Sequence, residues 1–441
     1  MHVIEELEKA QDLLASGDIP GLLRHLRVHG EALALDDVAR LIAQAARDAE
    51  FDDLAQAASA VAEGGENEDP RALYDFGYAC IERGVDGLAI RPLTQALELV
   101  PDAAPVLSEL VAALEHEGRH AQALTVLEEH EPAMEWSNRF QYVYNALMAG
   151  SLEKAHTGFT RLPEPEDASW RPAREKVRHM LARADVAGGA ASLDHQDLRG
   201  WHYVLTGGLL TSLSPYGFGA GMTGRWAYIS DSAEGCAEAL RRLRLILDAS
   251  GADPQAVTLL PGRSNLVLGI AAAELLGVPT QRFDPDKPAA HSLVVAYDLT
   301  ETDPQAVTAL RGRAPGQILF ERATRWTDPP RITADVSGLL AQTVVPPWGA
   351  RLRRLEDGTL GQDPEDDRPA EVVAAEIVRA EPDRDDGDGE TPADPDEGLR
   401  RFVATVAQAG TGARDGDGRW LGGGIREYVH NAGPVPSSRF L

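Results

Sequence analysis

The chain has 441 residues, a formal net charge of −28 and two cysteines. Its length exceeds that of one ordinary domain, so we expect two or three domains. The excess of acidic residues argues against nucleic acid and anionic membranes as partners, because each phosphate contact needs a lysine or an arginine. Two cysteines support neither a disulfide framework nor a structural zinc site. No signal peptide or membrane-spanning run is recognisable, which predicts a cytoplasmic protein.

Residues 70–101 carry a pattern of small and apolar residues that is typical of two short antiparallel helices. Gly77, Ala89 and Ala96 fall where the two helix axes would come closest, and bulk at these positions would push the helices apart. Gly84 falls at the turn between the helices, where glycine tolerates a positive φ. The stretch therefore predicts one helical hairpin.

The same pattern recurs at a spacing of about 34 residues on both sides of this hairpin. The residues that carry it in the 70–101 copy are Leu73, Phe76, Gly77, Cys80, Ala89, Leu93, Ala96 and Pro101. On these residues the stretch resembles a tetratricopeptide repeat. The resemblance implies an α-solenoid of about five stacked helix pairs over residues 1–187, closed by a capping helix near residues 171–185, with a groove for a protein or peptide. The alternative is an unrelated alanine-rich helical bundle.

From about residue 200, strand-like apolar runs alternate with helical ones, which predicts an α/β domain with a mostly parallel sheet over residues 190–350. The expected strands are residues 226–229, 256–260, 278–283, 292–297 and 317–321, and the expected helices are residues 233–249, 265–276 and 304–311. Sheets of this kind place ligands beyond the carboxyl ends of their strands.

Residues 356–398 contain seventeen acidic residues against three arginines, with many prolines and glycines. Because like charges repel and few apolar groups are available for a core, we expect this acidic segment to be a disordered tether. Residues 399–441 should form a short helix at about 399–409 and a loop-like tail.

The 34-residue register predicts which side chains of the first helices line the concave face of the solenoid. They are Arg40, Arg47, Arg71, Tyr74, Tyr78, Arg139 and Tyr142. Arginine and tyrosine are common anchors of protein interfaces. The lysine and asparagine set with which chaperone-binding members of the family hold a terminal carboxylate is absent there, so the expected ligand is an extended or helical peptide.

Two loops of the α/β domain occur in the order of the pyrophosphate and phosphate loops of type I phosphoribosyltransferases. Residues 259–279 and 294–303 resemble these loops, and the resemblance implies a phosphate-ligand site at Arg263, Ser264, Asn265, Asp298, Glu301 and Thr302. However, Tyr297 replaces an acidic residue, and Asp303 replaces a glycine that would cradle the phosphate. We therefore expect weak or no binding of a small anionic ligand, and no phosphoribosyl transfer.

The function predicted from the sequence is a scaffold or adaptor that binds a protein partner through the solenoid groove, with an α/β domain that senses a small anionic ligand. The alternatives are an enzyme that acts on a phosphorylated or nucleotide-like small molecule and a serine hydrolase that uses Ser264. We expect no catalytic residue, metal ion or cofactor, except Mg²⁺ if the phosphoribosyltransferase-like alternative holds. The sequence does not indicate an oligomeric state.

Overall fold

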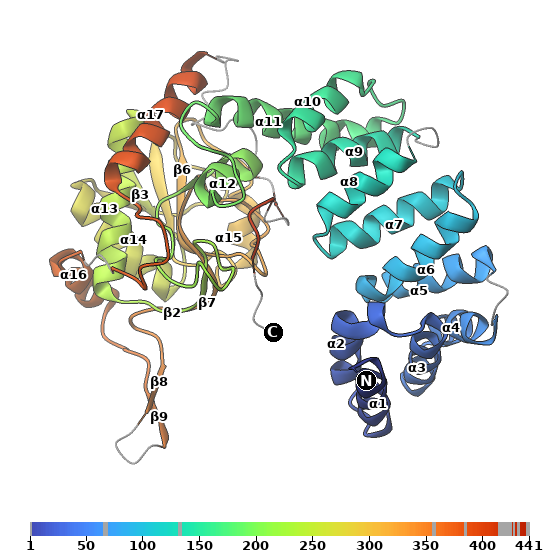
Figure 1. Cartoon of the computed structure of the whole chain (residues 1–441). Helices are drawn as coiled ribbons and strands as arrows, with labels where there is room; N and C mark the ends of the chain where they lie inside the picture. The colour runs from blue at the N-terminus through green and yellow to red at the C-terminus, as the bar shows by residue number, and fades with distance from the viewer. Residues whose placement is uncertain are drawn as a thin grey trace. The chain divides into compact units, whose positions relative to one another are not determined.

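The structure is a computed structural model that describes residues 2–64, 69–130, 135–354, 359–382, 386–412, 426, 428, 429 and 433–437. The chain divides into two compact units, Met1–Val177 and Arg178–Leu441 (Figure 1). The division falls within helix α11 (Arg171–Ala187). None of the helices in the described ranges combines the length and hydropathy that crossing a membrane requires.

The first unit is entirely helical in its described residues. Its elements are α1 (His2–Ala15), α2 (Ile19–His29), the 3-10 turn η1 (Gly30–Ala32), α3 (Leu35–Asp48), α4 (Asp52–Gly64), α5 (Pro70–Glu82), α6 (Asp86–Leu99), α7 (Ala104–His116), α8 (His120–Glu129), α9 (Trp136–Met148), α10 (Leu152–Arg161) and η3 (Ala168–Trp170). From α3 to α10 each helix packs against the next one along the chain (Figure 1). Many helices in the N-terminal part were expected, and this is confirmed.

The turns inside the helix pairs repeat at a nearly constant spacing. Each of the five turns contains one residue with a positive φ: Gly17, Glu50, Gly84, Gly118 and Gly150. Their separations are 33, 34, 34 and 32 residues, from 50 − 17, 84 − 50, 118 − 84 and 150 − 118. Because side chains disfavour this conformation, glycine is the expected residue, and Glu50 is the exception among the five.

The helices of a pair approach closely through small residues. A Cβ atom added at Gly77 would lie only 2.5 Å from Cγ of Leu93 on the facing helix. Ala89 and Ala96 are completely buried in the same apolar core, which extends over the first eight helices. The sequence-based reason for the small residues of this hairpin therefore holds in the structure.

The second unit combines a sheet with helices. Its elements are α12 (Leu198–Thr206), β1 (Leu209–Leu210), β2 (Trp226–Ser230), α13 (Ala233–Ser250), β3 (Ala256–Leu259), α14 (Arg263–Leu276), β4 (Thr280–Arg282), β5 (Ser292–Ala296), α15 (Pro304–Ala309), β6 (Ile318–Arg325), β7 (Val336–Val345), β8 (Arg351–Arg354), β9 (Leu360–Asp363), α16 (Ala370–Arg379) and α17 (Asp396–Gly412). The main sheet has the order β1-β7-β6-β5-β3-β4, β2 pairs with β7, and all these pairs are parallel. The predicted parallel α/β part is confirmed, with a separate antiparallel pair β8-β9.

Helices cover both faces of this sheet, as expected for parallel strands. Helix α14 packs on the face that carries Val295, because a Cβ atom at Gly269 would contact this residue and Leu259. Val294 has the opposite orientation in β5 and belongs to a core cluster with Ala306 and Val307 of α15. Helices α16 and α17 form an outer layer against α14 and α13 (Figure 1).

The acidic segment 356–398 is ordered in much of its described part, so our expectation of disorder needs correction there. Helix α16 lies within it and buries Val373 and Ile377, which are one helical turn apart. Farther along, Asp394 accepts hydrogen bonds from Arg199 and Arg242 at 2.8 Å. These arginines neutralise the charge that we expected to keep the segment extended. Residues 356–358 and 383–385 lie outside the described residues.

The C-terminal part contains the expected helix, α17, and further contacts to the second unit. The guanidinium of Arg426 is fully buried and donates to Asp335 at 3.1 Å. Arg225 donates to the carbonyl oxygens of Val435 and Pro436, both at 3.2 Å. The predicted loop-like tail falls partly outside the described residues, at 413–425, 427, 430–432 and 438–441.

Candidate functional site

Helix α5 carries two aromatic side chains that are not buried: Tyr74 is half-buried and packs against the apolar core of the first unit, and Tyr78 is exposed. The rings of Tyr74 and Tyr78 stack with centroids 6.1 Å apart, and the guanidinium of Arg71 lies 5.8 Å from the Tyr74 centroid. Tyr78 is 42% exposed, which is unusual for a large aromatic residue between two buried helix positions. Arg71 also pairs with Asp75 at 2.9 Å. Three of the residues predicted for the groove are therefore together on one helix face.

Helix α9 carries aromatic residues at the equivalent positions. Tyr74 and Tyr78 precede the turn residue Gly84 by ten and six positions, and Phe140 and Tyr144 precede Gly150 by the same numbers. The Phe140 and Tyr144 rings stack with centroids 6.4 Å apart, and both are half-buried.

Two tryptophans extend the aromatic group on α9. Trp136 stacks on Phe140 with centroids 5.7 Å apart, and Trp170 of η3 lies 5.6 Å from Phe140. Trp136, Phe140 and Tyr144 thus form a stacked row on α9, and Trp170 packs against the first two rings of this row. Such a row needs little ordering on binding, because each ring has few rotatable bonds.

These positions define a surface that we call the first-helix face. Helices α5, α7 and α9 are neighbours through direct contacts, so equivalent positions on them lie side by side. Counted back from the turn residues of α3, α5, α7 and α9, the face consists of Arg40, Gln44, Tyr74, Tyr78, Ser108, Ala112, Phe140 and Tyr144. None of the eight is buried.

The other predicted groove residues lie partly on this face and partly elsewhere. Arg40 is on the face and pairs with Asp36 and Asp37 of its own helix. Arg47 donates to Ser59 at 3.2 Å. Arg139 and Tyr142 line a different cavity of about 230 Å³ among α8, α9 and α10. These two residues are not at the positions that define the first-helix face: Tyr142 precedes its turn by eight residues, as the core residue Phe76 does.

Two carboxylates, Glu82 and Glu109, lie near Tyr74 of the first-helix face. Partial burial raises the pKa of Glu109 on α7, and the nearby charge of Glu82 on α5 raises it further. Burial also raises the pKa of the Tyr74 phenol, with a second contribution from Glu109. The crowding of these acidic groups would be relieved by a cationic group of a ligand.

The predicted phosphate-ligand loops do meet in the second unit. They follow β3 and β5, the adjacent strands between which the strand order reverses, the usual ligand position in such sheets. The amide of Asn265 joins them: its Nδ2 atom donates to Thr302 Oγ1 at 3.2 Å, and its Oδ1 atom accepts from the Tyr297 backbone at 2.9 Å. Asn265 and Thr302 are both buried.

Groups of the protein itself engage the remaining predicted ligand residues of the first loop. The indole of Trp348 donates to Ser264 Oγ at 2.9 Å and packs edge-on against Tyr297 at 5.3 Å. Arg263 donates to the carbonyl oxygens of Asp366 and Arg368 at 2.5 and 2.7 Å. Arg263 and Ser264 are thus directed to the segment that follows β7 and do not converge with Thr302.

The acidic residues of the second loop are also engaged. Arg325 donates to Asp298 at 2.9 Å and to Glu301 at 2.7 Å, so a guanidinium occupies the place that a cation would take between them. Asp303 caps α15 by accepting from the backbone of Gln305 and Ala306, both at 3.0 Å. This helix terminus is therefore satisfied internally.

A buried charged cluster beside these loops was not anticipated. Asp231, directly after β2, accepts from Arg322 and from the Tyr297 hydroxyl at 2.8 Å each, and from the Cys236 thiol at 3.4 Å. All four side chains are buried. Asp231 and Arg322 also border a cavity of about 720 Å³, and Asp394 is another of its lining residues.

Glu321 on β6 is a buried carboxyl group whose pKa can be tested through the pH dependence of stability. Burial raises its pKa to about 8, with a further contribution from Asp298, although Leu299 N donates to it at 2.7 Å. The folded state therefore holds the proton between pH 4.5 and 8 where the unfolded state releases it. Stability from this group is complete below pH 4.5 and is lost as the pH rises to about 8.

We expect Glu321→Gln to remove this pH dependence. Between pH 5.5 and 8 the free energy of unfolding of the wild type should fall, relative to the variant, by about 1.4 kcal/mol per pH unit. Urea denaturation at several pH values measures the difference. If the free energies of unfolding of the two proteins changed with pH in parallel, Glu321 would have an ordinary pKa in the folded state, which would contradict this prediction.

Several of these residues were missed for identifiable reasons. Phe140 and Tyr144 could have been found by counting back from Gly150, since the other turn glycines mark the same register. Asp231, Arg322 and Trp348 are separated by up to 117 positions, from 348 − 231, and no short motif connects them. No protein-family model matches the chain, and a search of curated proteins finds no similar sequence.

Proposed function

We propose that residues 1–187 form a tetratricopeptide-like solenoid and that the protein is a scaffold or adaptor that binds a peptide segment of a partner protein. The main supporting observation is a stacked aromatic pair at equivalent positions of two first helices, Tyr74 with Tyr78 and Phe140 with Tyr144, in which no ring is fully buried. Partly exposed tyrosines and other aromatic residues are typical interface anchors.

The repeat spacing supports the solenoid in this proposal. Turn residues 32 to 34 positions apart match the period of about 34 residues of the tetratricopeptide family. A repeat array of this kind leaves one row of first helices available to a ligand along its length.

The charge pattern favours a cationic peptide. Glu82 and Glu109 crowd each other beside Tyr74, and a lysine or arginine of the ligand would reduce their repulsion. A tyrosine ring also attracts such a cation through its π face. We therefore expect a partner segment that combines basic and apolar or aromatic side chains.

Selection of a peptide display library against the full chain tests this function. Enriched peptides should be rich in arginine or lysine, bind at micromolar or lower concentration, and depend on the aromatic residues of the first-helix face. A library that yields no enriched peptide, or only peptides that bind the Tyr74→Ala/Tyr78→Ala variant equally well, would contradict the proposal.

For the α/β unit, sensing of a small anionic ligand remains the accompanying proposal, supported by the position of the Asn265 and Thr302 loops at the reversal of strand order. The internal contacts of Asp303 and Arg325 argue against phosphoribosyl transfer. Calorimetric titration of the full chain with phosphoribosyl diphosphate and Mg²⁺ should give no micromolar binding; such binding would favour the enzyme instead.

A further inference from the structure

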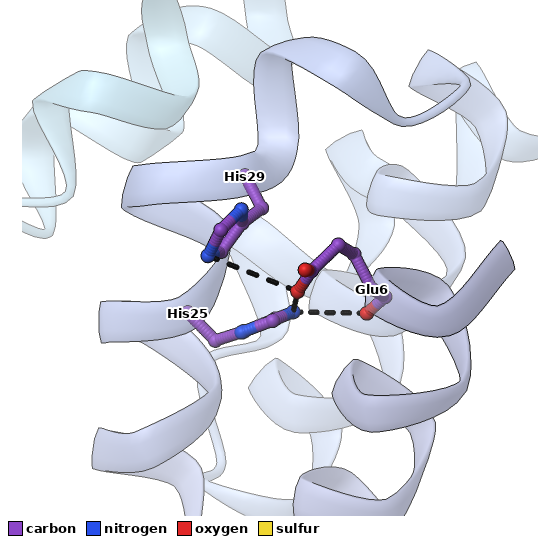
Figure 2. A group of neighbouring side chains, drawn as sticks. All are labelled: Glu6, His25 and His29. Atoms are coloured by element: carbon purple, nitrogen blue, oxygen red, sulfur yellow. Dashed lines mark hydrogen bonds and ion pairs between the residues drawn. The ribbon is translucent and has the colours of Figure 1, made fainter. Parts of the chain in front are cut away.

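Two histidines and a glutamate meet between the first two helices (Figure 2). Glu6 lies on α1, and His25 and His29 lie one turn apart on α2. Glu6 Oε2 is 3.4 Å from His25 Nε2 and 3.7 Å from His29 Nε2. Figure 2 shows the carboxylate directed toward both rings, whose centroids are 4.7 Å apart.

This spacing is close to what a tetrahedral metal centre requires. Bonds of about 2.0 Å from an ion to nitrogen and oxygen donors place the donors roughly 3.3 Å apart. The two measured carboxylate–imidazole distances exceed this by only a few tenths of an ångström. Two histidines separated by four residues on a helix, with one carboxylate, form a donor set suited to Zn²⁺.

We propose that Glu6, His25 and His29 bind a Zn²⁺ ion that fastens α1 to α2. Such a link would stabilise a helix with little buried surface, because among the described side chains of α1 only Ala10 is buried. His25 is 7% exposed, which limits water at the ion, while the partly exposed His29 leaves a path for it to enter.

Without the ion, the ring of His25 has another partner. Its Nε2 atom lies 2.9 Å from the backbone oxygen of Glu6, so the metal-free form donates an N–H hydrogen bond there. An incoming ion takes the place of that proton, which is released to solvent, and the His25 ring turns its Nε2 atom from the Glu6 carbonyl oxygen toward the Glu6 carboxylate. Binding should therefore weaken in acidic buffer.

The test uses the full chain after dialysis against a chelator, titrated with Zn²⁺ by calorimetry. We expect one ion per chain, a higher melting temperature with the ion, and at least a tenfold loss of affinity in His29→Ala and in Glu6→Gln. Neither variant removes a buried apolar group. Co²⁺ in place of Zn²⁺ should give the visible absorption of a tetrahedral site in the wild type and not in His29→Ala.

His116→Ala is the matched control. His116 also pairs with a carboxylate, Asp86, at 2.8 Å, but among the residues that the structure describes this pair is not part of a cluster of three metal-ligating side chains. This variant should bind Zn²⁺ as the wild type does. Absence of binding by the wild type, or equal losses in His29→Ala and His116→Ala, would overturn the proposal.

Discussion

Asp231→Asn should lower the free energy of unfolding of the second unit by about 3–5 kcal/mol, because it removes one partner of a buried ion pair and leaves a charge without compensation. Asp231 and Arg322 are 2% and 4% exposed and 2.8 Å apart. Asparagine keeps the size of the side chain, but its NH2 group replaces one of two oxygens that both accept hydrogen bonds, so the loss reports the missing charge together with one lost acceptor. Chemical unfolding followed through the buried Trp201 and Trp348 measures it.

The control is Asp363→Asn in β9, where an exposed aspartate faces Arg353 at 3.5 Å. An exposed pair of this kind contributes less than about 1 kcal/mol. Cys236→Ala, which keeps the ion pair and removes only the thiol that donates to Asp231, should cost less than Asp231→Asn. A loss in Asp231→Asn no larger than in the β9 control would contradict the importance assigned to the cluster.

Much of the fold could be predicted from local patterns. The five helix pairs follow a spacing that turn residues and small residues mark in the sequence, and β5, a fully buried strand, is a continuous apolar run. Strand β7 was missed although it pairs with three strands. Its run contains Gly338, where a Cβ atom would lie 2.3 Å from the Arg322 carbonyl oxygen, so close packing requires a residue that weakens the strand signal.

The contacts that decide the sites were harder to predict because they join distant segments. The acidic segment looked disordered by composition, yet Asp394 meets Arg199, which is 195 residues earlier, and the guanidinium compensates the charge of the carboxylate. In the same way, the sequence makes Ser264 a plausible ligand residue, but in the structure its hydroxyl accepts a hydrogen bond from the indole of Trp348. Charge and composition are properties of one segment, whereas whether that segment is ordered depends on the distant residues that it contacts.

Loss of peptide binding in Tyr74→Ala/Tyr78→Ala is the second large effect that we expect. The two rings are already stacked, so a ligand gains their contact area without the entropy of ordering them. If each ring contributes about 1.5–2 kcal/mol as an interface anchor, the double variant should bind at least about a hundredfold more weakly. Phe140→Ala/Tyr144→Ala should weaken binding of peptides long enough to reach α9.

Calorimetric titration of the full chain with a peptide selected on it therefore tests the central claim, that the first-helix face is a peptide-binding surface. The control is Tyr228→Ala, which removes a tyrosine that is 59% exposed on β2 of the second unit. Far-ultraviolet circular dichroism should show unchanged helicity in all variants. We predict wild-type affinity in Tyr228→Ala and a loss of about a hundredfold in Tyr74→Ala/Tyr78→Ala. Undiminished affinity in the latter variant, with helicity intact, would contradict the account.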